Sequence, residues 1–460
     1  MAASVGLLAS CSQAPAYRPP AIATPAAFKE AGPWVPAAPG RPNSADWWRA
    51  LGDPRLDDLE ARLDRANPAL EQAMARHDAA TAQVGALRAR LLPSLDLGLA
   101  VSANRQSDNR PLRGSNQPDL YPADTLSASA GFDFDLWGTL RNSLAAGKAR
   151  AAAAGDEAAA VRLALESDLA KDYIALRALD WQADVLASAV DEYSRADQLT
   201  RNRYNGGIAS GVDVGRSGAQ LADAKAQLAD VRNGRALLEH AIASLVDEPA
   251  GSFAIPADSK RLNLPPLPQV LPSTLLERRP DIAAAERLMF AANREIGVAR
   301  GAFFPSIFLG GNGGFQNTGI AGLVAAPNLF WSVGPSVAAS LFDGGRRRAA
   351  ARVARANWSQ AAAAYRQAVL VAFQQVEDGM SRLHHLGEEQ EAEEQAVHMA
   401  SQASTLSTNR YIKGAASFLD VVTAQTAELA ARRRLYEIEA RRLQAAVALY
   451  CAIGGNWQKA

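Results

Sequence analysis

Two stretches of the sequence have hydrophobic residues at the three- and four-residue spacing of a helix that packs along one face. Neither 135–204 nor 343–411 contains a proline, so each is expected to form one continuous helix. A helix of that length spans about 100 Å, which is typical of a projecting coiled coil. The spaced residues are Leu176, Leu179, Ala183, Leu186, Val190 and Tyr193, and then Val369, Phe373, Val376, Met380 and Leu383.

Each long helix is followed by a tight turn with the pattern Tyr-x-x-Gly and by a second helix that runs back. The return helices are predicted at Asp213–Val246 and Leu419–Ile453, again without proline. Gly207 and Gly414 permit the positive φ that a sharp turn needs.

Before each long helix the pattern changes to the strict alternation of strands. Leu95–Val101 alternates apolar with polar or small residues, and so does Leu126–Phe134. Strands of about 9–11 residues can cross a bilayer when tilted; two hairpins of a small soluble sheet are the alternative. The remaining segments are a loop at Asn104–Asp124, a strand at Ile307–Phe315, a loop at Gln316–Asn328 and a strand at Phe330–Leu341.

This scheme occurs twice, which indicates an internal duplication. Asn67-Pro68 and Arg279-Pro280-Asp281 each open an Ala-rich helical stretch, and Leu199–Val214 aligns with Leu406–Val421. The predicted divisions are a first repeat at 67–248, a linker of the equatorial region at 249–278, and a second repeat with the C-terminal end at 279–460.

The N-terminus resembles a processed and lipid-anchored one. Leu8-Ala9-Ser10-Cys11 resembles the bacterial lipobox, in which the cysteine is acylated and becomes the first mature residue. A chance apolar start with a buried cysteine is the alternative. Residues 12–45 are rich in Pro and Ala and are expected to be an extended tether that builds no core. Residues 1–10 are therefore predicted to be a signal-peptide remnant and 11–66 a lipid-anchored segment.

Composition excludes several classes of protein. The 460 residues carry 48 Lys and Arg against 48 Asp and Glu, so no net charge attracts nucleic acid. No run of 18 uncharged apolar residues exists, so no transmembrane helix is predicted. Two cysteines imply no disulfide scaffold.

Four lipid-length strands cannot close a barrel, because open edges are not tolerated in lipid. Three chains would supply twelve strands, enough to leave a lumen. The predicted fold is mainly α with a membrane β-barrel. It is a trimeric 12-stranded barrel, four strands per chain, continued by an α-helical coiled-coil barrel; the resemblance given next implies that the β-barrel lies in the outer membrane and the helical barrel in the periplasm.

The combination resembles the outer-membrane efflux channels, in particular the lipoprotein branch of the TolC/OprM type (RND efflux system outer-membrane factors, NodT-like). The resemblance covers nearly the whole chain. It implies a homotrimer in the outer membrane that docks on a periplasmic adaptor and an inner-membrane RND pump. The matching pieces are Cys11, Trp47–Leu56, Glu277–Ile282, Phe303–Ile307, Leu341–Gly345 and the two Arg-Tyr-x-x-Gly tips.

No arrangement of residues predicts catalysis or a cofactor. No His-Glu-x-x-His or Cys-x-x-Cys spacing is present, and His384-His385 is interpreted as a solvated pair rather than a metal site. Cys451 is interpreted as a core residue. The glycine cluster at 310–314 lacks the Lys-Ser/Thr of a phosphate loop.

The functional prediction falls on the tips, where a trimer would gather three copies of Asp420 around its axis. A carboxylate ring at a constriction attracts cations, although an ordinary first-turn aspartate is the alternative. The resemblance assigns Asp420 to the gate and places Thr423 where the family has a second aspartate. It implies that Tyr411 and Asp213 tie neighbouring tips, and that Ala416 replaces the arginine of that tie.

The resemblance also makes the tips the adaptor-docking surface. The residues of this surface are Arg203, Tyr204, Gly207, Ser210, Arg410, Gly414 and Ser417. The predicted function is a passive exit duct of a tripartite efflux pump, not an enzyme. The alternatives are the exit duct of a type I protein secretion system and a peripheral coiled-coil scaffold.

Overall fold

The computed structural model describes residues 12–25, 27–30, 46–107, 109, 118–265, 278–455 and 457. It divides into two compact units. One unit consists of 1–21, 76–154 and 284–365 and contains the sheet. The other consists of 22–75, 155–283 and 366–460 and contains the helical hairpins. Cys11 and, of the tether, residues 26 and 31–45 lie outside the described residues.

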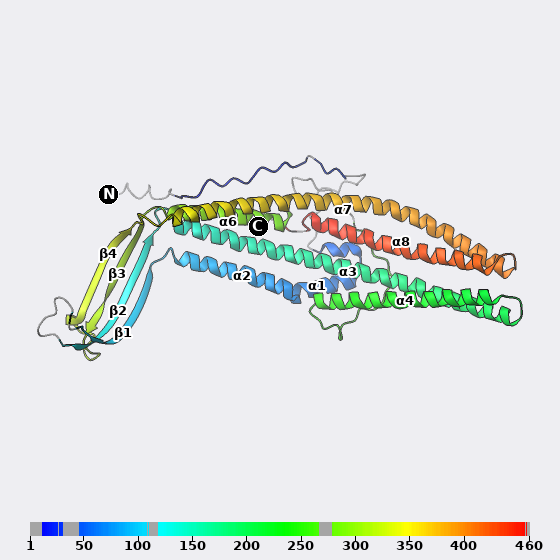
Figure 1. Cartoon of the computed structure of the whole chain (residues 1–460), viewed down its shortest axis with the longest axis horizontal. Coiled ribbons are helices and arrows are strands. Elements are labelled where there is room, and N and C mark those ends of the chain that lie inside the picture. The colour runs from blue at the N-terminus through cyan, green and yellow to red at the C-terminus, as the bar shows by residue number, and fades with distance from the viewer. Residues whose placement is uncertain are drawn as a thin grey trace. The chain divides into compact units, whose positions relative to one another are not determined.

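The first unit contains one antiparallel sheet with the strand order β1-β2-β3-β4 (Figure 1). Each strand therefore pairs with its neighbour in sequence, although β2 and β3 are separated by the long helical hairpin. Within the described residues, one edge of β1 and one edge of β4 have no partner strand. The strands are β1 Ser94–Arg105, β2 Leu120–Phe134, β3 Ser306–Asn317 and β4 Leu329–Ala338.

The register gives the sheet two different faces. Leu97, Ala128, Gly313 and Trp331 pair in one row across all four strands. The adjacent row consists of Asp96, Ser129, Asn312 and Ser332. Because successive side chains point to opposite faces, one face is apolar and the other polar. The large apolar side chains are exposed, with Leu97 at 78% and Trp331 at 74%.

The strand predictions were right in position, but several ends differ: β1 extends to Arg105 and β3 to Asn317, into the predicted loops. The loop predicted at Asn104–Asp124 is shorter, because Leu120–Asp124 belongs to β2 and pairs with Val101–Arg105. Pro122 fits there because pairing with β3 starts only at Asp124, so β2 is an edge on that side. The fourth strand ends at Ala338 rather than Leu341, since Ala338 faces Ser306, the first residue of β3.

The helices agree with the proline pattern. Two helices of 22 residues, α2 (Pro68–Ala89) and α6 (Pro280–Gly301), start at the expected prolines. The long helices α3 (Thr139–Asn205) and α7 (Arg346–Ile412) have 67 residues each, and the return helices α4 (Gly211–Leu245) and α8 (Phe418–Ala452) have 35 each. Among the described residues, no helix is both long and apolar enough to cross a bilayer.

In the second unit the hydrophobic core forms around the N-terminal helices η1 (Trp47–Leu51) and α1 (Pro54–Ala66). Trp47, Leu56 and Tyr173 are buried together with Ile242 and Val447 from the return helices. The Trp-Trp segment of the sequence is therefore the element that ties both hairpins to one core.

The described part of the predicted linker is held by the buried Arg177 and the half-buried Arg235. Arg177 donates from Nη1 to the carbonyl of Pro256 at 2.8 Å and to Asp180 at 3.0 Å. Arg235 donates to the carbonyl of Ile255 and to Asp180. Because these donors come from α3 and α4, the segment 253–258 is bound to the helices rather than loose.

The described part of the tether is extended, as predicted, but it packs on the protein. Phe28 is buried, and the carboxylate of Glu377 accepts hydrogen bonds from the backbone N–H groups of Lys29 and Glu30 at 2.8 and 2.9 Å. In the sheet-containing unit, Tyr17 lies edge-on against Phe290 on α6. The expectation that this segment builds no core was wrong at Phe28, which is buried, whereas Tyr17 is half-buried.

Candidate functional site at the tips of the helical hairpins

The two hairpin tips have the same backbone construction. Gly207 and Gly414 have φ of 73° and 75°, the left-handed conformation that favours glycine. Their N–H groups donate to the carbonyls of Tyr204 and Tyr411, both at 2.9 Å. Each long helix therefore ends in a turn that satisfies its last carbonyls, as the repeated glycine predicted.

Each return helix begins with a reciprocal capping box. The Oγ of Ser417 accepts from the N–H of Asp420 at 3.3 Å, and the carboxylate of Asp420 accepts from the N–H and Oγ–H of Ser417 at 3.0 and 2.9 Å. Ser210 and Asp213 form the same set of contacts at the first tip. Both aspartates are therefore built into the start of a helix.

Asp420 keeps a negative charge available at the surface. Its carboxylate is exposed, and the hydrogen bond from the Ser417 hydroxyl holds the pKa of that carboxyl below its usual range. Both hydrogen bonds that the carboxylate accepts from Ser417 end on one oxygen, Oδ2. Thr423, one turn further on, donates its hydroxyl to the carbonyl of Leu419 at 2.8 Å. Capping and a gate role are thus compatible for Asp420.

Tyr411 contacts the other hairpin through the guanidinium of Arg203. The guanidinium of Arg203, in the last turn of α3, lies 4.8 Å from the centre of the Tyr411 ring. On its own hairpin, Tyr411 packs against buried Phe418 with ring centroids 5.3 Å apart. Within the described part of this chain, Asp213 bonds to Ser210 rather than to Tyr411.

The two tips differ in how their tyrosines are held. Tyr204, the counterpart of Tyr411, is 51% exposed. The position equivalent to Phe418 is Gly211, which offers no ring to pack on. Arg410, the counterpart of Arg203, donates to the carbonyl of Ala415 at 3.3 Å on its own tip. The sequence repeat predicted two similar tips and could not predict that only Arg203 reaches across.

A groove of about 520 Å³ lies beside the second tip, between α3, α7 and α8. Tyr411, Phe418 and Val421 give it an apolar end, while Arg195 and Glu428 give it charged walls. It is the kind of surface that accommodates an apolar side chain with polar neighbours.

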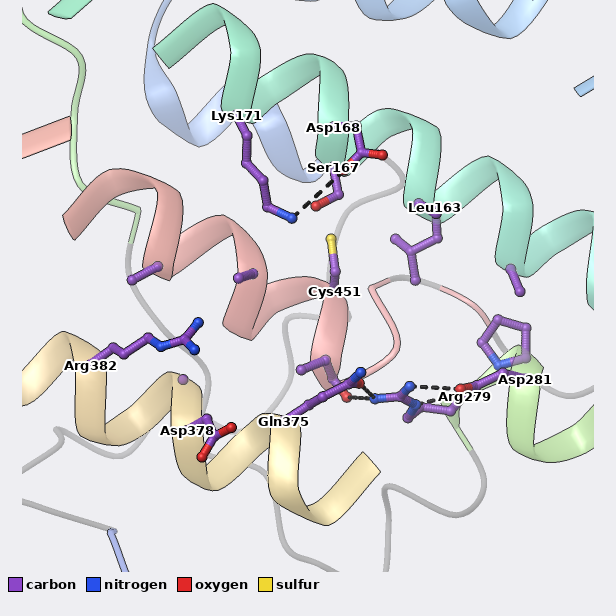
Figure 2. Close-up of a pocket in the computed structure, with 17 residues that line it drawn as sticks. Leu163, Ser167, Asp168, Lys171, Arg279, Asp281, Gln375, Asp378, Arg382 and Cys451 are labelled. Atoms are coloured by element: carbon purple, nitrogen blue, oxygen red, sulfur yellow. Dashed lines mark hydrogen bonds and ion pairs between the residues drawn. The ribbon is translucent and has the colours of Figure 1, made fainter. Parts of the chain in front are cut away.

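A second cavity of about 450 Å³ lies between α3, the start of α6, α7 and α8. Figure 2 shows the thiol of Cys451 pointing toward α3, where Ser167 and Lys171 lie. Burial raises the pKa of the Cys451 thiol to about 12, so the thiol is protonated at neutral pH and is a poor nucleophile. Its interpretation as a packing residue therefore has a chemical reason.

Arg279 at the edge of this cavity explains a motif that the sequence left open. Its guanidinium donates to Asp281, to Gln375 at 2.7 Å and to the carbonyl of Ala452 at 2.9 Å (Figure 2). The Arg-Pro-Asp segment thus joins the start of α6 to α7 and to the end of α8.

A cluster of buried carboxylates lies under α1. Glu60 is 0% exposed, and among the described residues neither of its carboxylate oxygens has a hydrogen-bond partner. Burial, reinforced by the charge of Glu166, raises the pKa of Glu60 to about 10. Burial also raises the pKa of Glu166 to about 7, against the opposing charge of Arg162. Glu60 is therefore protonated at neutral pH.

By its fold this is a mainly helical protein with one small antiparallel sheet and two capped helical hairpins. The chain matches the outer membrane efflux protein family over residues 61–246 and 271–455, and it belongs to that family. It is accordingly a protein of the bacterial outer membrane.

Individual relatives agree over nearly the full length. The chain is 30% identical to the pyoverdine export outer membrane protein OpmQ of Pseudomonas aeruginosa, over 98% of this chain and 95% of the relative. It is also 30% identical to the outer membrane protein OprJ of the same species, over 98% and 94%. The solved structure of the outer membrane protein VceC of Vibrio cholerae superimposes with a TM-score of 0.83 and 28% identity. The match covers 90% of this chain and 99% of VceC. The relatives are channel proteins, not enzymes.

Proposed function

We propose that this chain is the passive exit duct of a tripartite efflux pump. It conducts drugs or other small molecules from a periplasmic adaptor and an inner-membrane RND pump to the exterior. The observation that carries the proposal is the two-faced sheet with unpaired outer edges on a chain of the outer membrane efflux family. An exposed row of Leu, Val and Trp side chains suits lipid, and a polar row suits a water-filled lumen.

The functional unit of the proposal is a homotrimer. A four-stranded sheet with open edges leaves backbone N–H and C=O groups unpaired, which lipid does not tolerate. Three chains close a barrel of twelve strands, and their hairpins continue it as an α-helical barrel in the periplasm. The equal lengths of α3 and α7, and of α4 and α8, support an internal duplication behind this symmetry.

The tips form the closed end of the duct. Three copies of Asp420 make a ring of negative charge that favours cations. Thr423 leaves this ring single. Tyr411 and Asp213 tie neighbouring chains, and Arg203 supplies the cation that Ala416 lacks, by stacking on Tyr411.

The same tips dock the adaptor. Exposed residues repeated on both hairpins offer a surface that a partner can bind in two similar ways. The docking residues are Arg203, Tyr204, Gly207, Ser210, Arg410, Gly414 and Ser417. At the other end of the chain, acylation of Cys11 anchors the protein to outer-membrane lipid.

Two measurements test the proposal. Purified protein in a planar bilayer should show discrete, ohmic conductance without any energy source. In cells that also carry the adaptor and pump, loss of this chain should raise the accumulation of a fluorescent efflux substrate. Inserted protein that never conducts contradicts the duct. Conductance with unchanged dye efflux and lost secretion of a protein would indicate a type I secretion system.

A further inference from the structure

Three side chains with metal-binding atoms converge on one part of α7, away from the tips and the sheet. They are His384, His385 and Glu388. A helix turns by about 100° per residue, so Glu388 lies about 40° around the axis from His384 and between the two histidines. The sequence indicated only a solvated histidine pair. The structure adds the carboxylate that lies between them.

The distances are those of a site that is nearly formed. Nδ1 of His385 lies 3.0 Å from Oε2 of Glu388, and Nε2 of His384 lies 3.8 Å from Oε1. One ligand atom from each of the three residues lies within 4.8 Å of the others. Ligands bound to Zn²⁺ at about 2.1 Å in tetrahedral geometry are separated by about 3.4 Å. Small rotations of the two imidazoles therefore suffice.

Among the described residues, the carboxylate of Glu388 forms no ion pair with an arginine or lysine. Its neighbours Glu389 and Glu393 pair with Arg441 and Arg434. Within the described part of the chain, the ion-pair partners of Glu388 are the two imidazoles.

The group is accessible from solvent. The side chains of His384, His385 and Glu388 are 44%, 66% and 64% exposed. A metal ion can therefore reach the three ligands without rearrangement of the backbone, and water can fill its remaining positions.

We propose that His384, His385 and Glu388 form a binding site for a first-row divalent cation, with Zn²⁺ as the test ion. Two imidazoles and one carboxylate are a ligand set that Zn²⁺ and its neighbours in the series accept. Binding replaces the imidazole–carboxylate contacts with metal–ligand bonds. The site lies on α7, which the proposed duct also uses, but metal binding there does not depend on conduction.

The test is calorimetric titration of full-length protein in detergent with ZnCl₂, using protein without a polyhistidine tag. Wild type should bind one Zn²⁺ per chain at this site. His384→Ala and Glu388→Gln should each weaken this binding by at least about tenfold. The matched control is His398→Ala, which removes a histidine from the same helix that contacts Gln402 instead of a carboxylate; it should leave binding unchanged.

Two results would overturn the proposal. One is wild-type protein that takes up no Zn²⁺ at tens of micromolar. The other is a His384→Ala, His385→Ala double variant that binds Zn²⁺ with wild-type affinity and stoichiometry. The substituted side chains are largely exposed, and circular dichroism of each variant establishes that its helices are intact. Bilayer conductance of the same variants reports separately on the duct.

Discussion

The carboxylate of Asp420 both caps α8 and presents a charge, and two substitutions separate these tasks. Asp420→Asn removes the charge but keeps an oxygen that accepts from the N–H of Ser417. Ser417→Ala removes the cap, at a cost of about 1 kcal/mol, and keeps the charge. We expect the cation preference of the pore, read from the reversal potential in a salt gradient, to fall in Asp420→Asn and to persist in Ser417→Ala at neutral pH.

The pH dependence sharpens that prediction. Because the Ser417 hydroxyl lowers the pKa of Asp420, the charge survives to lower pH than it would on an unassisted carboxyl. Cation preference in wild type should therefore be lost only below the usual range of an aspartate. In Ser417→Ala it should be lost at higher pH. If cation preference depends on pH in the same way in wild type and Ser417→Ala, the Asp420 carboxylate does not determine the selectivity of the gate.

The contact between Arg203 and Tyr411 should hold the two hairpins together through the ring rather than the hydroxyl. Cation–π contacts at exposed positions contribute about 0.5–1 kcal/mol. Tyr411→Leu and Arg203→Gln should each raise the ratio of open to closed channels roughly two- to fivefold in single-channel recordings. Tyr411→Phe keeps the ring contact with Arg203 and removes only the hydroxyl proposed to bond Asp213 of a neighbouring chain, so it separates the two contributions. An effect of Tyr411→Phe as large as that of Tyr411→Leu would assign the tie to the hydroxyl.

The raised pKa values of Glu60 and Glu166 make the helical unit less stable as pH rises. Both groups bind a proton more tightly in the folded state than in the unfolded state. Their contribution is therefore complete below the ordinary glutamate pKa and declines as pH rises through about 7 and toward about 10. Glu60→Gln mimics the protonated form and should raise stability at pH 8 by roughly 1–3 kcal/mol.

The measurement for Glu60→Gln is the unfolding temperature in detergent at pH 5 and pH 8. The gain over wild type should be much larger at pH 8. Asp58→Asn on the same helix is the control, since the Asp58 side chain is 51% exposed. A gain for Glu60→Gln that is equal at both pH values would contradict a buried, protonated Glu60.

Among the elements, the sheet gives the sharpest test of which face meets lipid. Trp331 and Ser332 are adjacent on β4 and lie on opposite faces. Trp331→Arg should impair membrane insertion, because an arginine facing the middle of the bilayer costs about 2–4 kcal/mol. Ser332→Arg should insert normally and change ion selectivity instead. The amount of heat-resistant protein in the outer-membrane fraction measures insertion. If Trp331→Arg and Ser332→Arg lower that amount equally, the assignment of the two faces is contradicted.

The elements were readable from sequence where local rules decide them. Proline set the starts of α2 and α6, and alternation set the middle of each strand. The prediction was wrong at Leu120–Asp124, where local polarity indicated a loop but pairing with β1 continues the strand. It was also wrong for Phe28, because burial there depends on a helix more than 300 residues away in sequence.

The candidate site was predicted in part for the same reason. The Ser-x-x-Asp and glycine signals at each tip are local, and the structure places them as expected. The pairing of Arg203 with Tyr411 joins two hairpins, so neither segment alone contains it. The third residue of the proposed metal site, Glu388, lies on the same helix face as the histidines, and helical spacing could have revealed it.

At the scale of the whole molecule, the prediction is that three chains form one barrel. The mass of the protein particle in detergent, corrected for bound detergent, should be three times the chain mass of 48.6 kDa. Two differently tagged chains expressed together should purify in mixed particles. A stable single chain with full β-content would contradict the proposed closure, because its sheet edges would then be satisfied without neighbours.

The tips of the hairpins close their hydrogen bonds within a few residues of each turn. Each tip is therefore a small rigid body that keeps its shape whether the duct is shut or dilated, and bending must occur along the helices behind it. A partner that recognises one tip alone binds both states equally and cannot shift the balance between them. Only a partner that binds two tips at once, at a spacing found in one of the two states, can shift the balance between the closed and the open duct.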